Sequence, residues 1–378
     1  MVFAILIGLG LLSAPSSGAS PTAVAAPSPP VVRGDAALLM DLRTGQVLYA
    51  LRPDAREYPA STTKILTGII ALELGSLDDM VTADDDVLKA EGTRIYLEPG
   101  EQETLRDLLY AMLLNSANDA AVAIADHIAG NTGDFARLMN AVAAKVGATG
   151  SHFVNPSGLT DKNHYTTARD LALIARYAMH NPTFAAIVGT KTYTMPWPEK
   201  DDVRQLANQN RFLSRYDYAT GVKTGYTSQA KDTLVASASK DGVDLLAVIL
   251  RASGSTIWKD AAGLMDYGLA IAPKTVKAVP PGEGLAAAAV KDLGLSVATA
   301  AGTPPRAPGD PPPAHQTRPF AGPVWRGVLA AGVPMAALTT LAVAWAARRP
   351  RARRRRVVLR RVTRRGRVYV HRSIYRSR

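Results

Sequence analysis

Apolar residues recur at helical spacing in the first half of the chain and predict a block of buried helices. The first begins at about Ser61, carries apolar residues at 65, 66, 69, 70, 72 and 74, and ends before Gly75. Residues 78–103 are polar, contain the breaker Pro99–Gly100 and predict a loop. The same helical pattern then returns four times, at 104–114, 119–128, 134–146 and 168–179.

Short runs of β-favouring residues stand on both sides of this helical block. The first two flank Gly45 and predict a hairpin, and the last two form another across Asp241–Gly242. A final helix is predicted at 257–269. The fold class is therefore α+β, an antiparallel sheet flanked by helices with an inserted all-α region. The predicted strands are 36–40, 47–50, 191–195, 221–226, 234–238 and 243–250.

Two apolar segments near the ends suggest export and a membrane anchor. Val2 to Leu12 has the length of a signal-peptide core, although no Lys or Arg precedes it. Residues 327–347 carry no charge and are long enough to cross a bilayer as one transmembrane helix. The predicted organisation is a signal peptide (1–25), a flexible leader (26–34), a folded domain (35–272), an Ala/Pro-rich linker (273–323), a transmembrane helix (324–347) and an arginine-rich tail (348–378).

The positive charge of the chain is concentrated in this tail. Fifteen arginines and no Asp, Glu or Lys lie in 348–378, so a formal net charge of +12 leaves −3 for residues 1–347. Arginines beside a membrane helix stay on the cytoplasmic side, which predicts a single-pass cell-membrane protein with its folded domain outside the cytoplasm. A nucleic-acid arm is a weaker interpretation because no nucleic-acid-binding fold accompanies it.

Candidate chemistry begins with Ser61 and Lys64, which the first helix would place on one face three residues apart. A lysine can take the proton of a serine hydroxyl only if burial or a nearby cation lowers its pKa. The motif is common by itself, because Ser228 to Lys231 and Ser237 to Lys240 match it too. Two further motifs make it specific, and they follow in order: Ser116-Ala-Asn118 and Lys223-Thr224-Gly225.

This ordered set resembles that of penicillin-binding proteins and serine β-lactamases. Residues 35–272 look most like the D-alanyl-D-alanine carboxypeptidases, the low-molecular-mass penicillin-binding proteins. They depart from that family at Lys231, usually glycine, and at Thr233, often cysteine, and again after 272. The stretches that carry the likeness are 59–67, 92–100, 115–121, 153–159, 164–171 and 223–227.

The resemblance implies a role for each residue. Ser61 would be the nucleophile, Lys64 its general base, Ser116 a proton relay, and Asn118 a hydrogen-bonding partner of Lys64 and substrate. Lys223 and Thr224 would hold the substrate carboxylate, with Arg251 also steering it. Gly225 would leave room for substrate, and the backbone N–H groups of Ser61 and Tyr226 would form the oxyanion hole.

The implied activity is removal of the terminal D-Ala from peptidoglycan pentapeptides during cell-wall synthesis or remodelling, with β-lactams as covalent inhibitors. A transpeptidase, a β-lactamase and a non-catalytic peptidoglycan-binding relic remain alternatives. No cofactor, metal or nucleic acid is expected, and the oligomeric state is left open. The absence of cysteine excludes disulfides, thiolate zinc sites and a cysteine nucleophile. His127, His152 and His164 fit no catalytic motif and are expected in the core or at the surface.

Overall fold

The computed structural model describes residues 27–197, 200–297, 361–364 and 367–370. The chain divides into two compact units, Met1–Pro305 and Arg306–Arg378. The predicted signal peptide and transmembrane helix lie outside the described residues. No helix in the described part of the chain combines the length and apolar character needed to cross a bilayer.

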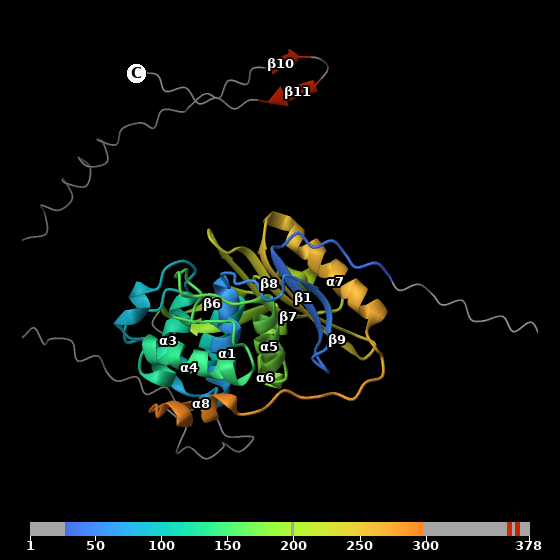
Figure 1. Cartoon of the computed structure of the whole chain (residues 1–378). Coiled ribbons are helices and arrows are strands. Elements are labelled where there is room, and N and C mark those ends of the chain that lie inside the picture. The colour runs from blue at the N-terminus through green and yellow to red at the C-terminus, as the bar shows by residue number, and fades with distance from the viewer. Residues whose placement is uncertain (1–26, 198–199, 298–360, 365–366, 371–378) are drawn as a thin grey trace, which may run out of the picture. The chain divides into compact units, whose positions relative to one another are not determined.

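An antiparallel sheet of five strands forms the centre of the first unit (Figure 1). Its order, β2-β1-β9-β8-β7, puts the N-terminal hairpin beside the last strands of the domain, and β7 lies at one edge. Both predicted hairpins are confirmed. The strands are β1 (Ala36–Asp41), β2 (Val47–Leu51), β7 (Ala219–Thr227), β8 (Lys231–Lys240) and β9 (Val243–Ala252).

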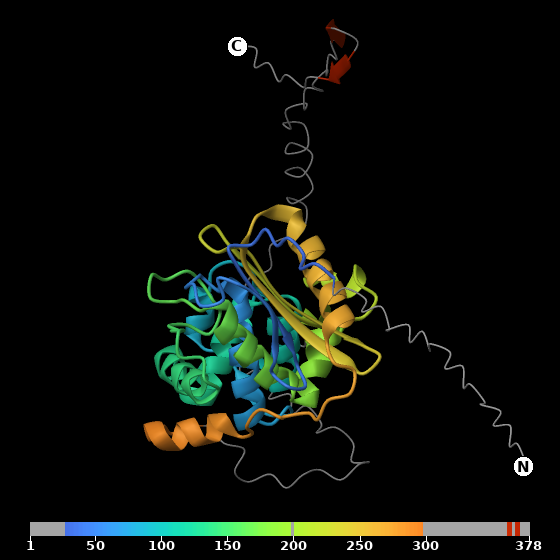
Figure 2. The same cartoon turned by 45° about the vertical axis from the view of Figure 1, so that its right-hand side comes forward.

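Helices cover both faces of this sheet, which explains why residues 36–40 of β1 are all apolar. Leu38 and Met40 point into the core shared with the helical region, whereas Ala37 and Leu39 pack on the opposite side. Because alternate side chains of a strand point to opposite faces, a strand buried on both sides reads as a continuous apolar run. Helix α7 (Ile257–Ile271) covers the second face, as Figure 2 shows.

The predicted helical block is confirmed around α1 (Lys64–Leu74), which is buried along most of its length. Side-chain caps start three of its helices, because Thr104, Asn131 and Thr167 each accept the backbone N–H three residues later. The helices of this block are α2 (Leu105–Leu114), α3 (Asn118–Ala129), α4 (Thr132–Lys145) and α5 (Ala168–Met179).

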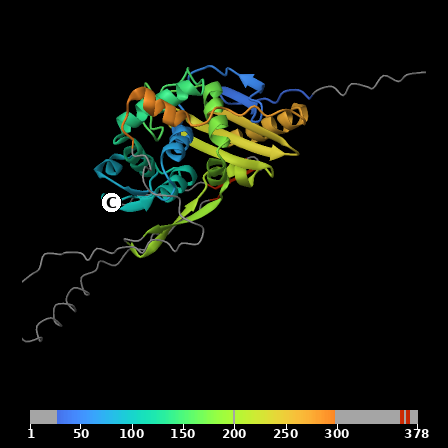
Figure 3. The ribbon, with the colours of Figure 1, turned by 90° about the horizontal axis from the view of Figure 1, so that it is seen from below.

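Several short elements differ from the sequence predictions. The predicted loop 78–103 contains a two-stranded pair, β3 (Met80–Thr82) with β4 (Gln102–Thr104), and the 3-10 helix η2 (Asp85–Lys89). Pro182 begins a helix, α6 (Pro182–Gly189), because its missing N–H is not needed in a first turn. The predicted strand at 191–195 is confirmed as β5 (Thr192–Trp197), which pairs with β6 (Asp202–Ala207) in the hairpin seen in Figure 3.

The first part of the predicted linker 273–323 also differs from the prediction, because it contains a helix. Residues 285–293 form α8 (Leu285–Leu293), whose Ala286 and Ala289 are buried in the helical core against α4 and α1. The backbone N–H of Ala286 donates to Glu73 at 2.8 Å and fixes the start of α8. Small alanines allow this close approach, so an Ala-rich segment packs here as a helix. In the second unit, β10 (Arg361–Arg364) pairs antiparallel with β11 (Arg367–Val370).

Candidate active site

Ser61 and Lys64 lie where a short 3-10 helix passes into α1. Ser61 belongs to η1 (Ala60–Thr63), and α1 begins at Lys64, three residues later than predicted. A tight 3-10 turn is a common start for an α-helix, and it keeps the two side chains on one side. Lys64 Nζ lies 3.1 Å from Ser61 Oγ, as the spacing predicted.

Lys64 is completely buried and is surrounded by neutral acceptors. Its Nζ donates to Asn118 Oδ1 and to the Ser157 carbonyl, both at 2.6 Å. Burial lowers the pKa of Lys64 well below that of an ordinary lysine, and the nearby Lys223 lowers it further, whereas Asp119 opposes both. The lowered pKa shifts Lys64 toward the neutral amine, whose lone pair can accept the Ser61 proton.

Asn118 connects Lys64 to the loop that precedes β4. Its Nδ2 donates to the Glu91 carbonyl at 2.5 Å, and its backbone N–H donates to the Thr93 carbonyl at 2.7 Å. The neighbouring Asp119 is buried and accepts the backbone N–H groups of Ile95 and Leu97. The first turn of α3 thus fixes both Asn118 and the loop at 91–97.

Ser116 lies in the break between α2 and α3. It is buried and has φ 65°, a left-handed conformation that is costly for a non-glycine residue. Ala60, just before Ser61, has φ 49°. Backbone strain of this kind is concentrated at functional sites, and here it occurs beside both serines.

The strand β7 supplies the third motif. Lys223 is buried, its Nζ donates to the Thr224 carbonyl at 3.1 Å, and burial lowers its pKa to about 7. Thr224, Gly225 and Tyr226 face the cavity. A Cβ on Gly225 would lie 2.7 Å from the backbone nitrogen of Ser61, so only glycine allows β7 to come this close to η1.

A cavity of about 530 Å³ joins these elements. Ser61 and Ser116 line it together with the end of β7, so all three motifs meet around one space. Arg251, predicted to steer the substrate carboxylate, is not in this lining, and neither are the buried Lys64, Asn118 and Lys223. Its Nε pairs with Asp35 at 3.1 Å and its Nη1 donates to the Gln229 carbonyl. The cation that does line the cavity is Arg211, which the sequence analysis did not single out.

The segment 153–159 is a further part of the site that sequence reasoning did not assign. Ser157 supplies the carbonyl that accepts from Lys64, and Gly158 has φ 85° and approaches so closely that a Cβ would lie 1.8 Å from the Ala60 carbonyl oxygen. The sequence did give one signal for it, because 153–159 is one of the stretches that resemble the D-alanyl-D-alanine carboxypeptidases. His164, expected in the core or at the surface, lies in the core, and its Nε2 lies 2.9 Å from Thr63 Oγ1. Burial lowers the pKa of His164 to about 4, so it stays neutral.

Comparison with known protein families agrees with the resemblance noted in the sequence. The family model of D-alanyl-D-alanine carboxypeptidases matches residues 23–254. The chain belongs to this family. It is 37% identical to the D-alanyl-D-alanine carboxypeptidase DacF of Bacillus subtilis and to DacB2 of Mycobacterium tuberculosis, over 57% and 63% of this chain. The alignments span 57% of the Bacillus relative and 82% of the Mycobacterium one.

Solved structures of D-alanyl-D-alanine carboxypeptidases and related enzymes share this fold. A D-alanyl-D-alanine carboxypeptidase from Mycobacterium tuberculosis has a TM-score of 0.62 at 35% identity, covering 68% of this chain and 98% of that one. A mutant of the Streptomyces K15 DD-transpeptidase has a TM-score of 0.61 at 32% identity, covering 64% of this chain and all of its own. The predicted penicillin-binding-protein-like α+β fold is therefore confirmed for the catalytic domain.

Proposed function

We propose that this chain removes the terminal D-Ala from peptidoglycan pentapeptides through an acyl-enzyme on Ser61. The observation that carries the proposal is the environment of Lys64, a buried lysine with a lowered pKa whose Nζ lies 3.1 Å from Ser61 Oγ. Family membership supports the same activity. A non-catalytic relic would have no need to keep this base next to the hydroxyl.

In the proposed reaction, Ser61 Oγ attacks the carbonyl carbon of the penultimate D-Ala while its proton passes to Lys64. The negative charge on the carbonyl oxygen is stabilised by the backbone N–H groups of Ser61 and Tyr226. Ser116 relays a proton to the leaving nitrogen, the C–N bond breaks and D-Ala departs. Water then attacks the ester, returning Ser61 and releasing the shortened peptide.

In this proposal the side of the cavity formed by β7 orients the substrate. Lys223 and Thr224 hold the terminal carboxylate, and Asn118, whose Oδ1 accepts from Lys64 and whose Nδ2 donates to the Glu91 carbonyl, offers its second amide N–H to the substrate backbone. The position of Arg211 in the cavity lining gives the carboxylate a second cation. Arg251 has no part in binding the carboxylate in this proposal, because it is paired with Asp35.

The test is covalent labelling of the purified full chain with a fluorescent penicillin. We expect wild type to label and Ser61→Ala not to label, and we expect D-Ala to be released from a pentapeptide by wild type only. The same Ser→Ala change at Ser228, whose hydroxyl bonds the neighbouring Gln229, is the matched control and should leave labelling unchanged. Normal labelling of Ser61→Ala would exclude Ser61 as the nucleophile.

A transpeptidase is the second candidate, supported by the likeness to the Streptomyces K15 DD-transpeptidase. The acyl-enzyme would then react with an amine instead of water. Adding an amino-acid acceptor to the pentapeptide assay separates the two outcomes, because only transpeptidation joins the acceptor to the product. A β-lactamase would instead turn over penicillin rapidly, whereas we expect the penicilloyl adduct to persist for minutes or longer.

We also propose that the chain is anchored once in the cell membrane by residues 324–347, with the catalytic domain outside and the arginine-rich tail inside. The support is the uncharged segment 327–347 followed by fifteen arginines. Protease added to intact cells stripped of their outer layers should digest the domain and leave a small C-terminal fragment, detected by a tag after Arg378. Loss of the tag together with the domain would contradict this topology.

A further inference from the structure

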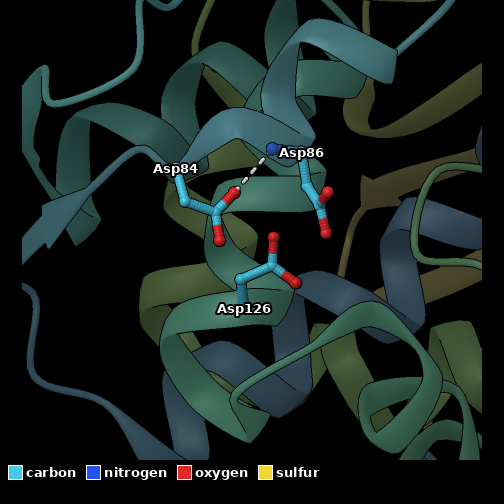
Figure 4. Close-up of side chains that lie close together, drawn as sticks. All are labelled: Asp84, Asp86 and Asp126. Atoms are coloured by element: carbon cyan, nitrogen blue, oxygen red, sulfur yellow. Dashed lines mark hydrogen bonds between the residues drawn. The ribbon is translucent and has the colours of Figure 1, made fainter.

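Two titratable side chains take no part in the proposed reaction, although their surroundings shift their pKa strongly. Asp126, whose pKa is raised to about 7 mainly by burial, turns toward Asp84 and Asp86 outside the lining of the active-site cavity (Figure 4). His164, whose pKa is lowered to about 4 mainly by burial, contacts the residue that precedes Lys64. Of the two, His164 is therefore placed to act on the general base.

Each ring nitrogen of His164 has one partner. The backbone N–H of Val154 donates to Nδ1 at 3.2 Å, and Nε2 lies 2.9 Å from Thr63 Oγ1. Because a backbone N–H can only donate, Nδ1 accepts, so the single proton of the neutral ring lies on Nε2 and is donated to Thr63. His164 is 1% exposed and packs edge-on against Phe153, with the ring centroids 5.5 Å apart. The neutral imidazole therefore bridges η1 and the segment 153–158.

Both ends of this bridge lead to Lys64. Thr63 is its neighbour in sequence. The segment held through Val154 supplies the Ser157 carbonyl, which accepts from Lys64 Nζ at 2.6 Å. His164 thus sets where the Ser157 carbonyl lies relative to Lys64.

The Ser157 carbonyl in turn decides where the lone pair of Lys64 points. A neutral amine has two N–H groups and one lone pair. The Ser157 carbonyl oxygen and Asn118 Oδ1 can only accept, and each lies 2.6 Å from Nζ, so together they take both N–H groups. The lone pair is then left for Ser61 Oγ, which lies 3.1 Å away and has a proton to give. Displacing the Ser157 carbonyl would free one N–H and misdirect the lone pair.

We propose that His164 is a positioning residue, which holds the Ser157 carbonyl so that the lone pair of Lys64 faces Ser61. This inference rests on the proposed roles of Ser61 and Lys64. The two ring bonds of His164 go to Thr63 and Val154 and not to the residues that hold the substrate carboxylate. His164 should therefore govern the rate of acylation and leave ligand binding unchanged.

The test is the time course of penicillin labelling of the purified full chain over a range of concentrations. It separates the limiting rate constant of acylation from the half-saturating concentration. His164→Leu should lower the limiting rate constant roughly 10–100-fold and leave the half-saturating concentration within about twofold of wild type. Thr67 Oγ1 still donates to the Pro156 carbonyl, so the segment should shift without unfolding. A loss of stability alone would lower the final labelled fraction but not the rate constant.

Thr63→Val tests the other end of the bridge, because it removes only the hydroxyl that accepts from Nε2. We expect the rate constant to fall roughly 3–30-fold. The double variant with His164→Leu should be no slower than His164→Leu itself, because both changes break one bridge. His164→Asn keeps an acceptor at about the position of Nδ1 and should lie between wild type and His164→Leu.

His152→Leu is the matched control. It removes the same ring just before the segment, where Nδ1 donates to the Asn163 carbonyl at 2.7 Å, and it should keep the wild-type rate constant.

The proposal is overturned if His164→Leu and Thr63→Val both keep the wild-type rate constant within about threefold, or if His164→Leu changes only the half-saturating concentration. If His164→Leu does not fold, Thr63→Val and His164→Asn decide, and wild-type rate constants for both would overturn it. A wild type that does not label at all would instead overturn the proposed roles of Ser61 and Lys64, and this inference with them.

Discussion

Lys64 and Arg204 are both enclosed basic side chains, but their partners differ. Lys64 is surrounded by a hydroxyl, an amide oxygen and a carbonyl, none of which carries a charge. Arg204, on the β5–β6 hairpin, pairs with Glu101 at 2.5 Å and Glu103 at 2.9 Å, and donates to the Ile95 carbonyl. Neutral acceptors leave a buried amine free to lose its proton, whereas carboxylates keep a buried cation charged and turn it into a structural link.

The largest effect should follow from removing the enclosed base. Lys64→Met keeps the length of the side chain but cannot take a proton, so the rate of acylation by penicillin should fall by about 10²–10⁴-fold. The measurement is stopped-flow or gel-based labelling, with circular dichroism as a check on folding. Acylation within threefold of wild type would show that another group takes the Ser61 proton.

Breaking the structural cation should change stability rather than chemistry. Arg204→Met leaves two buried carboxylates without their partner and should lower the free energy of unfolding by about 3–5 kcal/mol, measured by urea denaturation at pH 8. Arg137→Met, which breaks an exposed pair with Asp134, is the control and should cost less than about 1 kcal/mol.

The loss in Arg204→Met should also depend on pH. Burial and the neighbouring Glu101 already raise the pKa of Glu103 to about 8 despite Arg204. A carboxyl with a raised pKa binds its proton more readily in the folded state, so folding is favoured below that pKa and disfavoured as pH rises through it. The destabilisation should therefore be smaller at pH 5 than at pH 8, and an equal loss at both values would contradict a charge effect.

The smallest and most diagnostic change concerns the second lysine. Lys223 lowers the pKa of Lys64 by repulsion, so Lys223→Ala should raise that pKa. The neutral base then forms only at higher pH, and the acidic limb of the kcat/KM profile should move upward, together with a higher KM. An unchanged profile with an unchanged KM would remove Lys223 from the site.

Local patterns predicted the parts of the fold that depend on neighbours in sequence. The spacing of Ser61 and Lys64, the helical pattern at 168–179 and the Asp241–Gly242 turn each depend on residues near in sequence, and each is confirmed. The closeness of Gly225 to the Ser61 nitrogen could not be read in this way, because it depends on how β7 docks against η1. Arg251 shows the same limit, since its pairing with Asp35 is set by the sheet order.

The sheet order also makes catalytic competence a late event in folding. The first strand, β1, pairs with β9, so the sheet cannot close until Leu38 is paired with Val248, which lies far along the chain. Such long-range pairings carry a large loop-closure entropy and slow folding. Ser61 gains its cavity only when β7, from the last third of the domain, has joined that sheet. A partly folded chain would therefore carry an intact Ser61 and Lys64 yet remain unreactive, and penicillin labelling during refolding would time the completion of the domain.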